Sequence, residues 1–322
     1  MNPKTSKALK IILPLLLAVF LVWYSLHKVS FGQLVVFFKE ADYRWIVLGM
    51  LFGFLSHLSR AYRWLFLLEP LGHKIKFNNS VMAIFSAYLI NYTIPRAGEI
   101  ARATIITNYE SVPFEKGFGT IVAERIADLI VMFAIILITL FIQFDFLYGM
   151  LIEKFNPMKI VIVFVLLTFL GVLFFRFLKR STSKMALRIK AFVNGLIEGV
   201  LSIFKMKKKW AFIFHTLFIW VMYVLMFYVT SLAFKDLGNL SLGAILVGFI
   251  AGSFSIAATN GGIGSYPVAI YAALSIFNIP EEPSIAFGWI MWFAQTLMII
   301  IFGGLSLIYL PIYNRKSDIK TL

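Results

Sequence analysis

The sequence predicts an all-α polytopic membrane protein with about six full transmembrane helices and two re-entrant helical hairpins in an inverted-repeat arrangement. Hydrophobic residues make up 61% of the 322 residues, charged residues only 14%, and the mean hydropathy is +0.88. A water-soluble fold needs more charge to cover its surface, so a bilayer is the solvent that fits this composition. In addition, apolar runs of membrane-crossing length recur along the chain, and two apolar stretches are interrupted by Pro or Gly.

The excess of basic over acidic residues indicates which molecules the protein contacts. Lys and Arg number 30 against 15 Asp and Glu, a net charge of +15. In a membrane protein this surplus lies in the connections between spans, where it favours anionic lipid headgroups over nucleic acid. The chain has no cysteine and its four histidines are scattered. We therefore expect no metal site and no cofactor.

The spans follow from helix geometry, because a rise of 1.5 Å per residue lets about 20 apolar residues cross the hydrocarbon core. Six runs qualify: residues 9–26, 45–68, 117–143, 158–175, 210–234 and 284–310. The basic loop 176–209 is predicted to be cytoplasmic by the positive-inside rule. Both termini are basic and are placed on the same side.

Two further apolar stretches, residues 78–106 and 237–280, are each interrupted near the middle. Basic residues flank the first stretch, which is predicted to enter and leave on the cytoplasmic side. Acidic residues flank the second, which is predicted to enter and leave on the outer side. Non-helical backbone at membrane depth must be buried in protein or line a water-filled cavity. Both stretches are therefore interpreted as re-entrant hairpins inside the bundle.

The order of these segments is span, hairpin, span in both halves of a single membrane domain, residues 1–322. The first half covers residues 1–143 and the second covers 210–322, with a span and the basic loop in 144–209. This order is typical of inverted-repeat transporters, although symmetry can also be fitted to hydropathy alone. Residues 185–204 have helical apolar spacing, which fits either an amphipathic helix on the inner leaflet or an ordinary connector.

Charged residues inside predicted spans are candidates for function, because each costs roughly 2.5 to 3.5 kcal/mol on insertion scales. Arg60 and Arg63 lie on one helical face near the inner end of the second span, where they either bind a ligand or reach the interface by snorkelling. Glu124, Arg125 and Asp128 lie in the third span. They are interpreted either as a structural ion pair or as a counter-charge or proton relay.

The tips of the two hairpins differ in chemistry. The first tip carries Pro95-Arg96-Ala97-Gly98-Glu99-Ile100-Ala101-Arg102, in which Pro95 and Gly98 are predicted to break the helix and Arg96 and Arg102 to bind phosphate. The alternative is a cytoplasmic loop with ordinary positive-inside arginines. The second tip has no charge and contains Asn260, Gly261, Gly262 and Gly264, which allow a headgroup to approach closely or two helices to pack.

This ordered set of motifs resembles the transmembrane, flippase-like region of the lysylphosphatidylglycerol synthase family. The resemblance rests on residues 95–102, on Glu124-Arg125-x-x-Asp128 and on Gly261-Gly262-Ile263-Gly264. It implies lipid translocation in a bacterial or archaeal cytoplasmic (inner) membrane. Since nearly all of this sequence is apolar, we expect it to lack the aminoacyl-transferase domain of two-domain members, and Pro267 stands where an acidic residue often follows the glycine turn. The resemblance therefore does not transfer the substrate.

We therefore expect a lipid flippase that moves an anionic phospholipid or a polyprenyl-phosphate-linked substrate between leaflets. Arg60, Arg96 and Arg102 would hold the phosphate, and Glu99, Glu124 and Asp128 would supply counter-charge or proton coupling. The main alternative is a non-transporting scaffold for a glycosyltransferase or another lipid-modifying enzyme. A lipid-phosphate transferase is a third hypothesis, but the sequence lacks a convincing nucleophile, metal cluster or nucleotide-binding loop. The chain is expected not to be an enzyme, and a homo-oligomer is possible.

Overall fold

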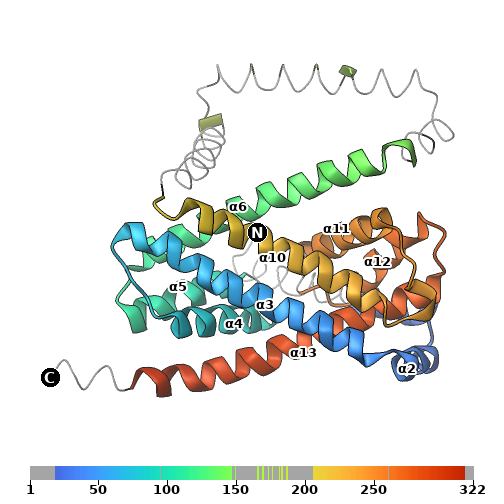
Figure 1. Ribbon diagram of the computed structural model, residues 1–322, viewed down its shortest axis with the longest axis horizontal. Coiled ribbons are helices and arrows are strands. Elements are labelled where there is room, and N and C mark those ends of the chain that lie inside the picture. The colour runs from blue at the N-terminus through green and yellow to red at the C-terminus, as the bar shows by residue number, and fades with distance from the viewer. Residues whose placement is uncertain are drawn as a thin grey trace, which may run out of the picture. The chain divides into compact units, whose positions relative to one another are not determined.

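The computed structural model describes residues 19–94, 96–146, 206–259 and 261–315, with scattered residues between 149 and 187. Every regular element in these ranges is helical (Figure 1). Two units divide the chain: residues 1–122 together with 210–322, and residues 123–209. The predicted span 158–175 and the amphipathic segment 185–204 lie outside the continuously described ranges.

The described part of the larger unit begins with the helix Val19–Lys28, which is bent by 76° from the short helix α2 (Phe31–Glu40). Ser30 forms a capping box with Gln33 at the start of α2, which explains why a new helix begins there. The remaining helices are α3 (Tyr43–Leu68), α4 (Phe77–Thr93), α5 (Ala97–Glu110), the first residues of α6 (Phe114–Ile142), α10 (Lys209–Ser231), α11 (Leu242–Ala258), α12 (Ser265–Ser275) and α13 (Glu281–Asn314), with short 3-10 turns Glu69–Leu71 and Lys235–Leu237.

Three of these helices, α6, α10 and α13, are long and apolar enough to cross a membrane, and the bent pair at the N-terminal end of the described chain is a fourth if it counts as one span. Helix α13 covers the predicted span 284–310, and α6 and α10 cover most of the predicted spans 117–143 and 210–234. In the second unit, α6 exposes large apolar side chains such as Phe133 and Phe141, which is 84% exposed. Apolar exposure on this scale fits contact with lipid.

Helices α3 and α10 run antiparallel along their length. The Asp42 amide donates to the Ala233 carbonyl at one end, and Arg63 contacts Thr216 near the other. Between them lies a Gly-x-x-x-Gly motif, in which a Cβ on Gly49 would collide with Thr230 and a Cβ on Gly53 would lie 2.8 Å from the Met226 sulfur. Small residues at this spacing let two helices approach closely in a membrane.

Helix α13 packs against both α4 and α12, over different parts of its length (Figure 1). Toward its C-terminal end, Asn314 exchanges hydrogen bonds with Asn79, and Gly303 packs on the backbone of α4 at Phe85. Toward its N-terminal end, Gly288 lies against Pro267 of α12. With 34 residues, α13 is about 51 Å long by helical rise.

The two interrupted stretches of the sequence form pairs of packed helices. Helices α4 and α5 contact each other on either side of a break at residues 94–96, and α11 and α12 do so on either side of residues 259–264. Both breaks were expected from the Pro and Gly residues in the sequence. Pro95 and Asn260 themselves lie outside the described residues.

Candidate functional site

The first helix break presents Arg96 in an unusual conformation. Its φ of 62° and ψ of 10° are left-handed, and its side chain is exposed at the N-cap of α5. Arg96, Ser111 and Asn278 are the described non-glycine residues with positive φ. The left-handed region costs an ordinary residue roughly 1–2 kcal/mol because Cβ approaches the following carbonyl oxygen. A glycine would satisfy this backbone better, so the arginine side chain is retained at a cost to folding.

Gly98 does not break the helix, which corrects the sequence prediction. It lies inside α5 and is buried, and a Cβ there would collide with the Ala87 carbonyl oxygen of α4. Its amide donates to the Asn91 side chain at 2.7 Å. Gly98 therefore lets α4 and α5 pack closely, and the Asn91 side chain satisfies one of the N-terminal amides of α5 that have no partner within the helix.

The second break is built from glycines and hydroxyl groups. Gly261, Gly262 and Gly264 have φ values of 66°, 78° and 69°, a backbone region that residues other than glycine rarely adopt. The Ser255 hydroxyl donates to the Ser265 hydroxyl at 2.7 Å, and the Thr259 hydroxyl lies 2.8 Å from the same oxygen. These bonds tie the end of α11 to the start of α12.

The two breaks meet beside the middle of α13, in a group that we call the tip junction: Tyr92, Gly261, Trp292 and Thr296. The Thr296 hydroxyl donates to the Tyr92 hydroxyl at 3.2 Å, and the Trp292 indole donates to the Gly261 carbonyl at 2.7 Å. A Cβ on Gly261 would lie 2.7 Å from the Tyr92 ring. Residue 296 divides α13 into parts of about 22 and 27 Å by helical rise.

Buried arginines lie on the α3 and α5 side of this unit. The Arg102 guanidinium stacks 3.8 Å from the centre of the Trp64 ring, and the Trp64 indole donates to the Thr120 hydroxyl at 2.9 Å. Arg63 is fully buried, with its guanidinium 3.0 Å from the Thr216 hydroxyl. Arg60 is 4% exposed and lies one turn before Trp64 on the same helix.

The predicted phosphate-binding arginines therefore lie on two helices, α3 and α5, and not on one exposed loop; we call Arg60, Arg96 and Arg102 together the arginine column. Arg96 is exposed at the break, whereas Arg102 is 5% exposed and lies six residues, or about 9 Å, further along α5. Trp64 connects Arg102 to the helix that carries Arg60. Glu99, which is half-buried, falls between Arg96 and Arg102 at a spacing of three residues from each. Sequence spacing alone did not separate the exposed arginine from the buried one.

The predicted charged group of α6 divides between two faces of that helix. Glu124 and Asp128 are buried, at 1% and 7% exposure, and follow Thr120 at intervals of four residues. Arg125 is exposed on another face. In the part of the chain that the structure describes, no three His, Asp or Glu side chains gather closely enough to hold a metal ion.

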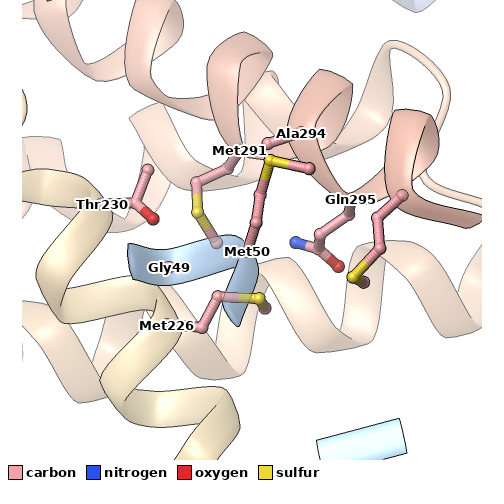
Figure 2. A pocket seen from close by; sticks show the side chains of 8 residues that line it. Gly49, Met50, Met226, Thr230, Met291, Ala294 and Gln295 are labelled. Carbon is pink, nitrogen blue, oxygen red and sulfur yellow. The ribbon is translucent and has the colours of Figure 1, made fainter. Parts of the chain in front are cut away.

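A narrow pocket lies between α3, α10 and α13 (Figure 2). Its lining is mainly methionine, with two small residues and two neutral polar side chains: Gly49, Met50, Met226, Thr230, Met291, Ala294, Gln295 and Met298. No charged side chain lines it, so it is unsuited to a phosphate. The sequence analysis did not single out this pocket, nor Trp64, Tyr92, Trp292 and Thr296, whose only sequence signal is an aromatic or hydroxyl group within an apolar run.

Comparison with known proteins gives a family. The sequence model of the lysylphosphatidylglycerol synthase TM region matches residues 11–303, which is most of the chain and includes all three motifs. The chain belongs to this family. The resemblance inferred from the motifs is therefore confirmed.

Three relatives come from archaea. A UPF0104 membrane protein of Methanocaldococcus jannaschii is 23% identical over 308 residues, covering 86% of this chain and 87% of that protein. A UPF0104 membrane protein of Pyrococcus horikoshii is 27% identical over 152 residues, covering 46% of this chain and 42% of that protein. The glycosyltransferase AglD of Haloferax volcanii is 25% identical over 130 residues, covering 40% of this chain and 21% of AglD. The similarity to the first of these proteins thus covers most of both chains.

Proposed function

We propose that this protein is a lipid flippase that moves an anionic phospholipid or a lipid-linked phosphate between membrane leaflets. A charged headgroup cannot cross bare hydrocarbon cheaply, and a polar path through protein removes that barrier. The observation that carries the proposal is the meeting of two broken helices beside the middle of α13, with an exposed, conformationally strained arginine at one of the breaks.

Helix lengths support re-entrant hairpins within about six full spans. Helices α4 and α11 have 17 residues each, α5 has 14 and α12 has 11, all shorter than the roughly 20 residues that a full crossing needs. Helix α4 lies along one part of α13 and α12 along the other, and their broken ends meet between them. These contacts support the predicted inverted repeat, because such repeats place a substrate between discontinuous helices near the bilayer midplane.

The arginine column supplies the chemistry for a phosphate. Guanidinium groups present planar donors that match phosphate oxygens. Arg96 meets the headgroup at the break, and Arg60 and Arg102 continue the positive charge along α3 and α5. Glu99, Glu124 and Asp128 supply counter-charge or proton coupling in this proposal. The neutral second break, with Gly261, Gly262 and Gly264 and the neighbouring Asn260, gives the headgroup close access to the backbone.

The test uses a substitution that removes charge without straining the backbone. Arg96→Gly suits the left-handed conformation, so the folded protein is expected to be stabilised by about 1 kcal/mol. Lipid translocation is expected to fall at least tenfold. Purified protein in liposomes would be assayed with fluorescent anionic lipids, including a polyprenyl phosphate, by accessibility to an external quencher with and without a pH gradient.

Ser111→Gly is the matched control, because Ser111 ends the same helix with a φ of 54°. It relieves the same kind of strain and should leave translocation unchanged. Unchanged translocation in a well-folded Arg96→Gly protein would overturn the role of Arg96. Absence of translocation by the unaltered protein for every lipid in the panel would overturn the flippase proposal.

A scaffold for a lipid-modifying enzyme is the second candidate. The similarity to 21% of the glycosyltransferase AglD favours it, because a protein named for sugar transfer contains a stretch similar to this chain. A scaffold needs no strained arginine and no buried charge, which are costly in a membrane. Co-purification of a glycosyltransferase, combined with no translocation in liposomes, would favour this alternative.

A further inference from the structure

An aromatic cluster beside the arginine column has no role in the function proposed so far. It consists of His57 on α3, Tyr88 on α4, and Trp220 and Tyr223 on α10. The His57 ring centre lies 4.8 Å from that of Tyr88 and 6.1 Å from that of Tyr223, and Trp220 lies 6.2 Å from Tyr223. Three helices thus bring four rings together within the larger unit.

Two ring nitrogens in this cluster are buried without a partner. His57 is 8% exposed, and its Nδ1 makes no hydrogen bond to any residue that the structure describes. The Trp220 Nε1 likewise has no acceptor among the described residues. Buried polar atoms are nearly always hydrogen-bonded, because an unmade bond costs about 1–3 kcal/mol. Tyr88, Trp220 and Tyr223 are partly exposed, so the cluster reaches the surface of the unit, where a ligand can contact it.

The aromatic cluster lies close to Arg60 and to the tip junction. Arg60 follows His57 by three residues on α3, so the two side chains are neighbours on one helical face. Tyr88 precedes the tip-junction residue Tyr92 by one turn of α4. By these spacings the cluster lies along α3 and α4 between the tip junction and the buried Arg60, where the proposed function continues the positive charge inward from Arg96.

The chemistry of the cluster favours a neutral ring with hydroxyl groups. The C–H face of a sugar or inositol ring packs on aromatic rings, while its hydroxyls pair with the indole donor and the imidazole nitrogen. Aromatic rings also attract ammonium groups, but the adjacent Arg60 charge repels a cationic headgroup. This distinguishes a polyol headgroup from an aminoacylated one.

We propose that His57, Tyr88, Trp220 and Tyr223 form a subsite for a neutral ring polyol, a hexose or inositol, joined to the lipid through its phosphate. The phosphate lies against Arg60, and the ring stacks in the cluster and completes the hydrogen bonding of His57 and Trp220. This proposal rests on the proposed function, since it names the headgroup that the flippase would carry.

The test measures binding separately from transport. Affinities of the full chain in nanodiscs would be measured for four added lipids: a polyprenyl hexosyl phosphate, phosphatidylinositol, phosphatidylglycerol and lysyl-phosphatidylglycerol. At least one ring-bearing lipid is expected to bind ten times more tightly than phosphatidylglycerol. Trp220→Phe keeps an aromatic ring but removes the donor, and should lower that affinity about tenfold while leaving phosphatidylglycerol within twofold.

Trp210→Phe is the matched control, because Trp210 is on the same helix and 74% exposed. It should change neither affinity. If Trp220→Phe fails to fold, Tyr223→Leu removes a stacking face and should give the same selective loss. Preference for the hexosyl phosphate alone, or for phosphatidylinositol alone, would identify the source of the ring.

Equal binding of all four lipids, tightest binding of lysyl-phosphatidylglycerol, or an equal loss for ring-bearing and ring-free lipids in Trp220→Phe would overturn the subsite. This failure differs from failure of the flippase proposal. Arg96-dependent translocation of phosphatidylglycerol without polyol preference removes only the subsite. Trp220-dependent binding of a polyol lipid without any translocation removes only the transport function.

Discussion

The two helix breaks meet at one junction but differ in residue type: one carries a charged side chain, and the other is uncharged and rich in glycine. The first break carries a charged, exposed Arg96 in a strained left-handed conformation, and the Asn91 side chain on α4 accepts a hydrogen bond from the Gly98 amide on α5. The second has no charge, and its three positive-φ glycines are enclosed by neighbours on several sides. Gly261 lies against Tyr92, and a Cβ on Gly264 would lie 2.7 Å from the Val22 amide nitrogen.

This difference separates two tasks. At the first break, a strained backbone conformation exposes the Arg96 cation, which is expected of a functional position. The second break uses glycine to bring backbone close to other helices, which is the behaviour expected of a packing element that also leaves room for a ligand. Substitutions at the first break should therefore affect transport more than stability, and those at the second should affect stability first.

The largest effect on stability is expected at the second break. Gly261→Ala places a Cβ 2.7 Å from the Tyr92 ring in a residue with φ of 66°, so the folded state should lose about 2–4 kcal/mol, as judged by thermal unfolding in detergent. Gly72→Ala is the control, because Gly72 has φ of 86° and nothing within 4 Å of the added atom. It should lose only about 1 kcal/mol. Equal losses in the two variants would show that contact with Tyr92 is unimportant.

A second prediction concerns the buried end of the arginine column. Arg102→Lys keeps the charge but removes the planar group that stacks on Trp64, so a loss of about 1–3 kcal/mol is expected in the same unfolding measurement. Arg44→Lys on the exposed start of α3 should change stability by less than about 0.5 kcal/mol. If Arg102→Lys were as stable as the unaltered protein, the stack would not be a structural anchor.

At the first break, Asn91→Ala removes the acceptor for the Gly98 amide. The expected loss is about 1 kcal/mol, accompanied by faster hydrogen exchange at the first turn of α5. Thr93→Val is a suitable comparison, because its exposed hydroxyl bonds only the Ile90 carbonyl of its own helix. Protection of the Gly98 amide that survives in Asn91→Ala would contradict this assignment.

The smallest effect is expected at the helix that packs over the second break. Lys28 forms a 3.3 Å salt bridge with Glu281, and hydrogen bonding to that carboxylate raises the pKa of Lys28 above its ordinary value of 10.5. Its stabilising contribution is therefore complete below the ordinary value and is lost as pH rises through the higher folded value. In a plot of stability against pH, Lys28→Gln should reduce the loss of stability at alkaline pH. Added salt should reduce the same loss in the unaltered protein, because it screens the salt bridge. An alkaline limb unaffected by Lys28→Gln would exclude this salt bridge as its cause.

The sequence by itself determined the helical membrane class, the family and the places where helices break. The apolar composition requires a lipid bilayer around the helices. Pro or Gly within an apolar run weakens the backbone hydrogen bonds of the helix locally, whatever the tertiary structure. The motifs at residues 95–102 and 261–264 were sufficient to recognise the family, as the match to residues 11–303 confirms. The carboxylates of α6 and the re-entrant topology remain predictions.

Only the tertiary structure decided which residues of those motifs face outward and which are buried. Arg96 and Arg102 have the same chemistry and lie six residues apart, yet one is exposed at the break and the other stacks on Trp64 from a different helix. Gly98 was predicted to break the helix because glycine often does so. Its packing role was not visible in the local sequence, since its partner Ala87 belongs to another helix. Local sequence carries backbone preference, but burial depends on which side chains distant segments bring alongside, and that is settled only when the helices pack.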